Sequence, residues 1–226
     1  MRYAVLGTGV VGRTVAARLA SLGHEVVIGT RDPESTLARA EYADWQAAHP
    51  AIGLAGFPQA ARDGEVLVNA TGGRVSVDAL GEADPADLDG KVLIDIANPL
   101  DFSQGFPPVL DPANDDSLGE LIQRTFPRLR VVKTLNTMNC QIMVDPARVP
   151  GEHTVFLSGE DADAKKTVHD LLGSFGWPDR AILDLGGIET ARGTEMLLPV
   201  WLRVMGALGH SEFNFHIQTA GGAPSA

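Results

Sequence analysis

Residues 1–31, MRYAVLGTGVVGRTVAARLASLGHEVVIGTR, decide the fold of this chain. A short apolar run, 3–6, enters the glycine-rich turn 7–12. Apolar residues at helical spacing follow, and a second apolar run, 26–28, closes the unit. A strand, a tight glycine turn, a helix and a second strand form the context that the dinucleotide-binding fingerprint requires. We therefore expect a dinucleotide at this turn; the competing interpretation is a tight turn that binds no ligand.

The three glycines of the turn have separate physical tasks. Gly7 permits the sharp turn out of the first strand, and Gly12 lets the helix lie close to that strand. Gly9 lets a pyrophosphate approach the backbone, where free N–H groups and the helix dipole favour an anion. The turn residues expected to bind the cofactor are Gly7, Thr8, Gly9, Val10, Val11 and Gly12.

The residues after the second apolar run favour NADP(H) over NAD(H). Sites for NAD usually place an acidic residue about twenty positions after the glycine turn, where it bonds the ribose 2′-hydroxyl. Here that place is taken by Gly29, Thr30 and Arg31, and Asp32 comes one step late. A hydroxyl and a guanidinium suit a 2′-phosphate, which arginine can bind with paired hydrogen bonds. The alternative for Arg31 is a solvated surface charge.

Composition narrows the class of protein. The chain has 226 residues, 44% of them apolar, and a net charge of −11 from 18 basic and 29 acidic residues. An acidic chain does not favour nucleic acid or anionic membranes. The single cysteine, Cys140, excludes an internal disulfide. The first strand leaves no room for a signal peptide, and no apolar run is long enough to span a bilayer. We expect a cytoplasmic protein.

Downstream, predicted strands and helices alternate. Strands are expected at 52–57, 65–70, 91–97, 130–135, 154–158 and 181–184, and helices at 33–48, 58–61, 75–80, 117–125, 162–175 and 188–208. Alternation of this kind predicts an α/β fold, a Rossmann-type doubly wound parallel sheet with a small C-terminal α/β extension. We place an NADP-binding Rossmann domain at 1–150, a C-terminal acceptor-pocket and packing extension at 151–217 and a disordered tail at 218–226. Residues 101–116 are expected to form a long loop.

The last predicted helix is apolar nearly all round. Such a helix is buried, either against the sheet domain or against a partner subunit. Pro199 should kink or restart it. Apolar helices on small domains often pair, so we expect a homodimer.

Ligands of doubly wound sheets bind beyond the carboxyl ends of the strands. The residues at those ends should therefore form a row along one crevice. Besides the glycine turn and Thr30–Arg31, they are Asn69, Ala70, Thr71, Ala97, Asn98, Pro99, Asn136 and Thr137. Asp95 interrupts the apolar run that precedes Ala97. Its carboxylate is either bonded at the sheet's edge, which we favour, or part of the site.

The sequence offers no evident catalytic side chain. It contains no Tyr-x-x-x-Lys pair, no Ser-His-Asp order and no convincing catalytic histidine. His24 is expected to be structural, and ordinary surface or core roles are favoured for His210 and His216. No group of His, Cys, Asp or Glu has metal-ligand spacing, so we expect no bound metal. The sequence therefore assigns no residue to a catalytic step.

Taken together, GTGVVG, GHEVVIGTRDP, VVKTLNT, ETARG and LLPVWLRVMG resemble the NADPH-dependent F-420 reductases, also called F420-dependent NADP oxidoreductases. The same module occurs in the cytosolic part of the STEAP metalloreductases. The resemblance covers about residues 1–217. It implies a hydride shuttle between NADP(H) and a deazaflavin (F-420) or flavin-type acceptor such as FMN.

The resemblance also implies residue roles. Thr8, Gly9, Val10 and Val11 would contact the pyrophosphate; Thr30, Arg31 and Ser35 the 2′-phosphate; and Asn69, Ala70, Ala97 and Asn98 the path from adenosine to nicotinamide. The last helix, with Arg192 near its start, would wall the acceptor pocket. Two features depart from the family pattern: Met196 and Leu198 stand where hydroxyl residues are expected, and the 101–116 loop is longer.

Two other functions remain open from the sequence. The first is an NADP-dependent reductase of a small carbonyl or imine, which would need a proton donor near the nicotinamide. The second is a redox sensor that binds NADP(H) without turnover.

Overall fold

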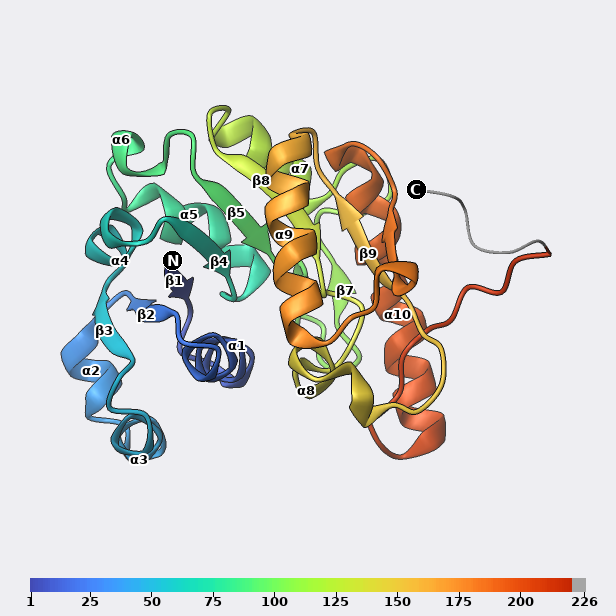
Figure 1. The fold of residues 1–226 in the computed structure, drawn as a ribbon, viewed down its shortest axis with the longest axis horizontal. Helices are drawn as coiled ribbons and strands as arrows, with labels where there is room; N and C mark the ends of the chain where they lie inside the picture. The colour runs from blue at the N-terminus through green and yellow to red at the C-terminus, as the bar shows by residue number, and fades with distance from the viewer. Residues whose placement is uncertain (221–226) are drawn as a thin grey trace.

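The computed structural model describes residues 1–220, and its centre is an eight-stranded sheet flanked by helices (Figure 1). The strand order is β10-β9-β8-β5-β4-β1-β2-β3, and every neighbouring pair is parallel except β8 and β9. The strands are β1 (Arg2–Leu6), β2 (Glu25–Thr30), β3 (Gly53–Gly56), β4 (Val66–Asn69), β5 (Val92–Asp95), β8 (Arg130–Thr134), β9 (Val155–Ser158) and β10 (Ile182–Asp184). The expected Rossmann-type sheet is confirmed.

The helices connect the strands and cover the sheet. They are α1 (Val10–Ser21), α2 (Pro33–Leu37), α3 (Ala40–Ala48), α4 (Phe57–Asp63), α5 (Ser76–Gly81), α6 (Pro85–Leu88), α7 (Leu118–Thr125), α8 (Cys140–Val144), α9 (Ala162–Phe175) and α10 (Ala191–Leu208). Short 3-10 helices lie at η1 (Gly73–Val75), η2 (Pro146–Arg148), η3 (Asp179–Ala181) and η4 (Ile188–Thr190). None of the helices within residues 1–220 is long and apolar enough to cross a membrane.

The core has two parts, one on each face of the sheet. Successive side chains of a strand point to opposite faces. Accordingly, Tyr3 and Val5 of β1 belong to one buried cluster, and Ala4 and Leu6 belong to the other. The first cluster includes buried residues of α1, α8 and α9, and the second includes residues of α4, α5 and α7. Burial on both faces explains the near-continuous apolar strands.

The structure corrects three expectations about local elements. The segment 33–48 forms two helices, α2 and α3, because Arg39 adopts an extended conformation between them. Helices α6 and α8 have no counterpart among the helices expected from the sequence. The 101–116 loop contains a small antiparallel hairpin of β6 (Leu100–Asp101) and β7 (Val109–Leu110), so it is not structureless.

Helix α10 is not buried all round, contrary to the expectation. Its buried residues are Ala191, Thr194, Glu195 and Leu198, which form a single stripe. Met196, Val200 and Leu208 are exposed. The helix packs against α7, η4 and β7. It also continues through Pro199 without restarting.

The C-terminal extension shares the main sheet. Strands β9 and β10 are its last two members, joined to the rest through the antiparallel pair β8–β9. The division at residue 150 stays a prediction. Of the expected disordered tail, 218–226, residues 221–226 lie outside the described part of the chain.

Helix α7 begins at an N-cap serine, Ser117, inside the predicted helix 117–125. Ser117 Oγ accepts a hydrogen bond from the Glu120 amide at 3.1 Å and donates to Glu120 Oε2 at 2.8 Å. We expect Ser117→Ala to lower the free energy of unfolding by about 1 kcal/mol, because it removes this cap. Urea denaturation measures the change, with Ser21→Ala on the exposed end of α1 as the control. Equal stability of the two variants would contradict the role of the cap.

Candidate functional site

A continuous cleft runs past the carboxyl ends of the parallel strands. One cavity, of about 630 Å³, lies at the glycine turn, and another, of about 390 Å³, lies near the ends of β5 and β8. Both cavities are lined by Ala70, Thr71, Gly72 and Val75. The shared wall makes them two halves of one elongated site, as expected for a ligand at the switch point of such a sheet.

The glycine turn suits a ligand that binds to backbone N–H groups. Gly7 has φ +121°, and a Cβ on it would lie 2.4 Å from the Ala70 carbonyl oxygen. A Cβ on Gly12 would lie 2.2 Å from the Gly7 carbonyl oxygen. The fold itself therefore requires both glycines. A Cβ on Gly9, by contrast, would meet nothing within 4 Å. Gly9 lines the cavity, so the open space before it fits a group that approaches the first-turn amides of α1.

Two arginines flank the 2′-phosphate position expected from the sequence. Thr30 and Arg31 line the first cavity, together with Arg39, which the sequence reasoning missed. Arg39 Nη2 donates to Thr8 Oγ1 at 2.9 Å. The extended conformation at the start of α3 is what places Arg39 here, and nothing in the sequence around it signals this turn. Asp78 and Glu82 also line this cavity.

Asp32, which follows Arg31, is the N-cap residue of α2. Its carboxylate accepts hydrogen bonds from the Ser35 hydroxyl at 2.6 Å and from the Ser35 amide at 3.1 Å. These bonds cap α2 and lower the pKa of Asp32. Neither Asp32 nor Ser35 is among the residues that line the cleft. The structure thus leaves Ser35 at the helix cap, where its hydroxyl is already engaged.

The Asn69 side chain supports the wall in the middle of the cleft by hydrogen bonds. Its Oδ1 accepts from the Thr71 amide and hydroxyl, and its Nδ2 donates to Ser76 Oγ and Asp95 Oδ1. Asn69 is fully buried and supports the wall from behind, whereas Ala70 and Thr71 line the cleft directly. A Cβ on Gly73 would lie 2.3 Å from the Asn98 carbonyl oxygen, so η1 fits tightly against the end of β5.

The second cavity contains Ala97 and Asn98, as the row of strand ends predicts. Asn98 Nδ2 donates to the Asn136 carbonyl at 2.7 Å, and Asn136 Nδ2 donates to Asn98 Oδ1 at 3.0 Å. Asn136 also lines this cavity, whereas Pro99 and Thr137 are buried outside its lining. Of the glycine-turn residues, Val11 reaches this cavity, while Val10 is exposed outside the cleft.

The outer wall of the second cavity is apolar and partly aromatic. It is formed by Leu100 and Phe102 from the hairpin, Met138 and Met143 near α8, and Leu198 and Trp201 from α10. Trp201 stacks on Phe213 at a centroid distance of 5.3 Å. Its Nε1 is buried, and within residues 1–220 it has no hydrogen-bond partner. Of all the residues that line this cavity, Arg74 is the only one with an ionisable side chain.

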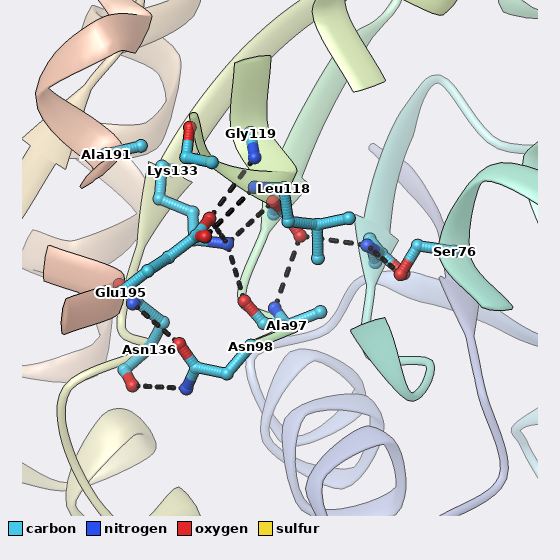
Figure 2. Close-up of polar contacts among 12 residues, drawn as sticks. Ser76, Ala97, Asn98, Leu118, Gly119, Lys133, Asn136, Ala191 and Glu195 are labelled. Carbon is cyan, nitrogen blue, oxygen red and sulfur yellow. Dashed lines mark hydrogen bonds and ion pairs between the residues drawn. The ribbon is translucent and has the colours of Figure 1, made fainter. Parts of the chain in front are cut away.

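A buried ionic cluster lies behind the second cavity (Figure 2). Lys133 Nζ lies 2.8 Å from Asp95 Oδ2 and 2.7 Å from Glu195 Oε1, and all three side chains are almost completely buried. This settles Asp95 as a bonded carboxylate at the sheet's edge. The sequence reasoning missed Lys133 and Glu195, although a lysine within the buried run VVKTL was a signal that it needed a partner. Across the described residues, no group of three or more His, Cys, Asp or Glu side chains could hold a metal ion.

The fold and the cleft define a Rossmann-type dinucleotide-binding protein, and comparisons identify its family. Residues 2–99 match the family model described as NADP oxidoreductase, coenzyme F420-dependent. The chain is 30% identical to the F420-dependent NADP reductase of Methanothermobacter marburgensis over 90% of this chain and 92% of that protein. The chain therefore belongs to the F420-dependent NADP oxidoreductase family and is an NADP-dependent oxidoreductase.

Other proteins are similar to this chain over most of its length. A putative F420-dependent NADP reductase from Arthrobacter sp. FB24 superposes with a TM-score of 0.94 at 59% identity, covering 97% of this chain and all of that one. Rat metalloreductase STEAP3 is 27% identical over 88% of this chain, which spans 38% of STEAP3. An imine reductase from Aspergillus terreus, at 15% identity and a TM-score of 0.63, shares the fold over 91% of this chain and 62% of its own.

Proposed function

We propose that the chain transfers a hydride between NADP(H) in the cleft and a deazaflavin (F-420) or flavin-type acceptor at its apolar end. The observation that carries the proposal is the difference in lining between the two ends of the cleft. One end combines a glycine turn with Arg31 and Arg39, and the other is walled by Met138, Leu198 and Trp201. The first suits a phosphorylated nucleotide, and the second suits a planar ring system.

The roles of the cleft residues follow from their positions. The turn residues Gly7, Thr8, Gly9, Val10, Val11 and Gly12 present the first-turn amides of α1 to the pyrophosphate. Thr30 and Arg31, joined by Arg39, bind the 2′-phosphate. Ala70 and Thr71, supported by Asn69, line the path along the cleft, and Ala97 and Asn98, backed by Pro99, border the nicotinamide. Ser35 holds the loop after β2 through Asp32. When bound, the nicotinamide supplies the hydride chemistry.

The apolar wall favours a flavin-type acceptor over a carbonyl or an imine. Reduction of a carbonyl or imine needs a positioned proton donor. Within the described residues, the cavity lining contains no Asp, Glu, His, Lys, Cys or Tyr side chain. A fused-ring acceptor takes the hydride on its own ring system, so alignment and exclusion of water are the main tasks left to the protein.

Turnover assays test the proposal directly. NADPH is mixed with the protein and F-420, then with FMN, and finally with a cyclic imine, while the nicotinamide absorbance is followed. We expect oxidation of NADPH with F-420 or FMN. Turnover only with the imine would support a carbonyl or imine reductase. Tight NADPH binding without oxidation by any acceptor would support a redox sensor.

Trp201 should contribute to acceptor binding and not to NADPH binding. It lines the second cavity only, next to Leu198 on the same helix. We expect Trp201→Ala to raise the KM for the acceptor about 10-fold through lost ring contacts, while the Kd for NADPH is unchanged. Trp201→Phe keeps a ring and should retain most of the affinity. An unchanged acceptor KM in Trp201→Ala would place the acceptor elsewhere.

The exposed side of α10 supports a homodimer. Met196, Val200 and Leu208 present apolar side chains to solvent on this helix. Helix faces of this kind mark association surfaces in small domains. Sedimentation equilibrium of the wild type and of Val200→Glu tests this arrangement. A wild type that sediments as a monomer would contradict it.

A further inference from the structure

The cluster of Asp95, Lys133 and Glu195 connects three elements around one buried ammonium group. Asp95 ends β5, Lys133 lies in β8 and Glu195 lies in α10. Lys133 is 1% exposed and Glu195 is 2% exposed. In Figure 2 the Lys133 side chain extends to a point between the Glu195 carboxylate and the end of β5. The strands and the C-terminal helix are thus joined at a single charged group.

The excess negative charge of the cluster is only partly offset by a helix terminus, because burial still raises the pKa of Glu195. Two carboxylates face one ammonium, which leaves one negative charge in excess if all three groups are ionised. Glu195 Oε2 accepts a hydrogen bond from the Leu118 amide at 2.9 Å, and Oε1 accepts one from the Gly119 amide at 3.2 Å. These amides are the first of α7, whose dipole favours a negative charge. Burial lowers the pKa of Lys133, but the two carboxylates more than offset it, so its pKa is raised and it stays protonated.

Lys133 also contacts the backbone of the cleft. Its Nζ donates to the Ala97 carbonyl oxygen at 2.5 Å. That carbonyl and the Asn98 amide belong to one planar peptide unit. Fixing the carbonyl therefore fixes the plane from which Asn98 enters the second cavity. The paired hydrogen bonds between Asn98 and Asn136 hold the other side of the same residue.

Glu195 extends this connection to the opposite wall. Residues three apart on a helix share a face, so Glu195 and Leu198 lie on the same side of α10. Glu195 is held by Lys133 and by the two α7 amides, which limits rotation of α10 about its own axis. Leu198 is 8% exposed and lines the second cavity. The Lys133 ammonium group is thus connected to both walls of the cavity, to Asn98 through the Ala97 carbonyl and to Leu198 through Glu195.

We propose that Lys133 is a positioning residue for hydride transfer: through the Ala97–Asn98 peptide and through Glu195 it sets the spacing between the nicotinamide side and the acceptor side of the cavity. The inference rests on the proposed function, since it takes the nicotinamide to lie beside Asn98. Lys133 is buried behind the cavity and is not among the residues that line it. Its role is to align the two walls, and it transfers no proton.

The test compares variants that change the cluster with one that changes a remote lysine. Lys133→Met leaves two buried carboxylates without their cation, so the double variant Lys133→Met/Glu195→Gln is made beside it to keep the buried charge unchanged. Lys165→Met is the matched control, because Lys165 pairs with Asp184 at 2.8 Å away from the cleft. For each protein the Kd for NADPH, kcat with F-420 or FMN, and the deuterium isotope effect from NADPH labelled at the transferred position are measured.

We expect the double variant to bind NADPH with the wild-type Kd, because the glycine turn and both arginines lie at the other end of the cleft. Its kcat should fall about 100-fold, the loss that a misplacement of about 1 Å can produce. The isotope effect on kcat should rise as the chemical step becomes limiting. Lys165→Met should match the wild type in all three measurements.

A folded double variant with wild-type kcat and isotope effect would overturn the inference. If neither Lys133 variant folds, Glu195→Gln carries the test. Lys133 and Leu118 contact different oxygens of Glu195, and glutamine replaces one of these oxygens by an NH2 donor, so one contact is lost. A lower kcat and a larger isotope effect are therefore expected there too, and wild-type values would overturn the inference. A wild-type protein that oxidises no NADPH with F-420 or FMN would instead contradict the proposed function, which the assays above establish separately.

Discussion

Replacing Arg31 and Arg39 together by alanine is expected to remove most of the preference for NADPH over NADH. Both guanidinium groups line the cavity beside Thr30, and Arg39 is oriented by its hydrogen bond to Thr8. Hydrogen bonds to charged groups are each worth about 1.5–3 kcal/mol, so two lost partners should weaken NADPH binding by roughly 100-fold or more. NADH carries no 2′-phosphate, so its affinity should change little.

The ratio of kcat/KM for NADPH to that for NADH measures this effect. The single variants show which arginine contributes to the ratio. A lower ratio in Arg31→Ala confirms the residue expected from the sequence, and a further decrease in the double variant confirms Arg39. Arg128→Ala is the control, because Arg128 pairs with Asp89 at the exposed end of another loop and does not line the cleft. An unchanged ratio in the double variant would show that the 2′-phosphate is bound elsewhere.

Alanine at Gly7 should mainly lower the stability of the protein, whereas alanine at Gly9 should mainly lower its affinity for the cofactor. Gly7→Ala places a methyl group 2.4 Å from the Ala70 carbonyl oxygen, at a φ of +121°. Strain and overpacking together should lower the free energy of unfolding by about 2–6 kcal/mol. Gly9→Ala meets no protein atom, so its effect on stability should stay below about 1 kcal/mol.

Affinity for NADPH should distinguish Gly9→Ala from Gly7→Ala. The methyl group of Gly9→Ala projects into the space where the pyrophosphate meets the first-turn amides, so NADPH affinity should fall roughly 10- to 100-fold. Thermal unfolding with and without NADPH measures both quantities at once, since a bound ligand raises the midpoint by mass action. A Gly9→Ala variant with wild-type NADPH affinity would mean that no phosphate lies against this turn.

The sequence predicts the arrangement of the first half of the cleft because that half is local. The glycine turn, β2 and Thr30–Arg31 follow one another within thirty-one residues, and the row of strand ends follows from parallel topology alone. The Ser117 cap of α7 is equally local. In each case the physical cause lies within a few positions of the residue concerned.

The parts that sequence reasoning missed depend on long-range contacts. Arg39 reaches Thr8 across 31 positions, and Lys133 meets Asp95 across 38 positions. Glu195 contacts the start of α7 more than 70 positions away. No local pattern reports such distances. The exposed side of α10 escapes the sequence for a similar reason. Composition shows that the helix is apolar, but it does not show which sides of the helix are covered by other parts of the chain.

The most direct test of the proposed function is a crystal structure of the protein with NADP bound. We predict that the 2′-phosphate lies between Arg31 and Arg39, the pyrophosphate against Gly9, and the nicotinamide beside Asn98 with one ring face open toward Trp201. A nicotinamide ring outside the second cavity, or a ring face closed by the protein on the Trp201 side, would contradict the proposed hydride transfer.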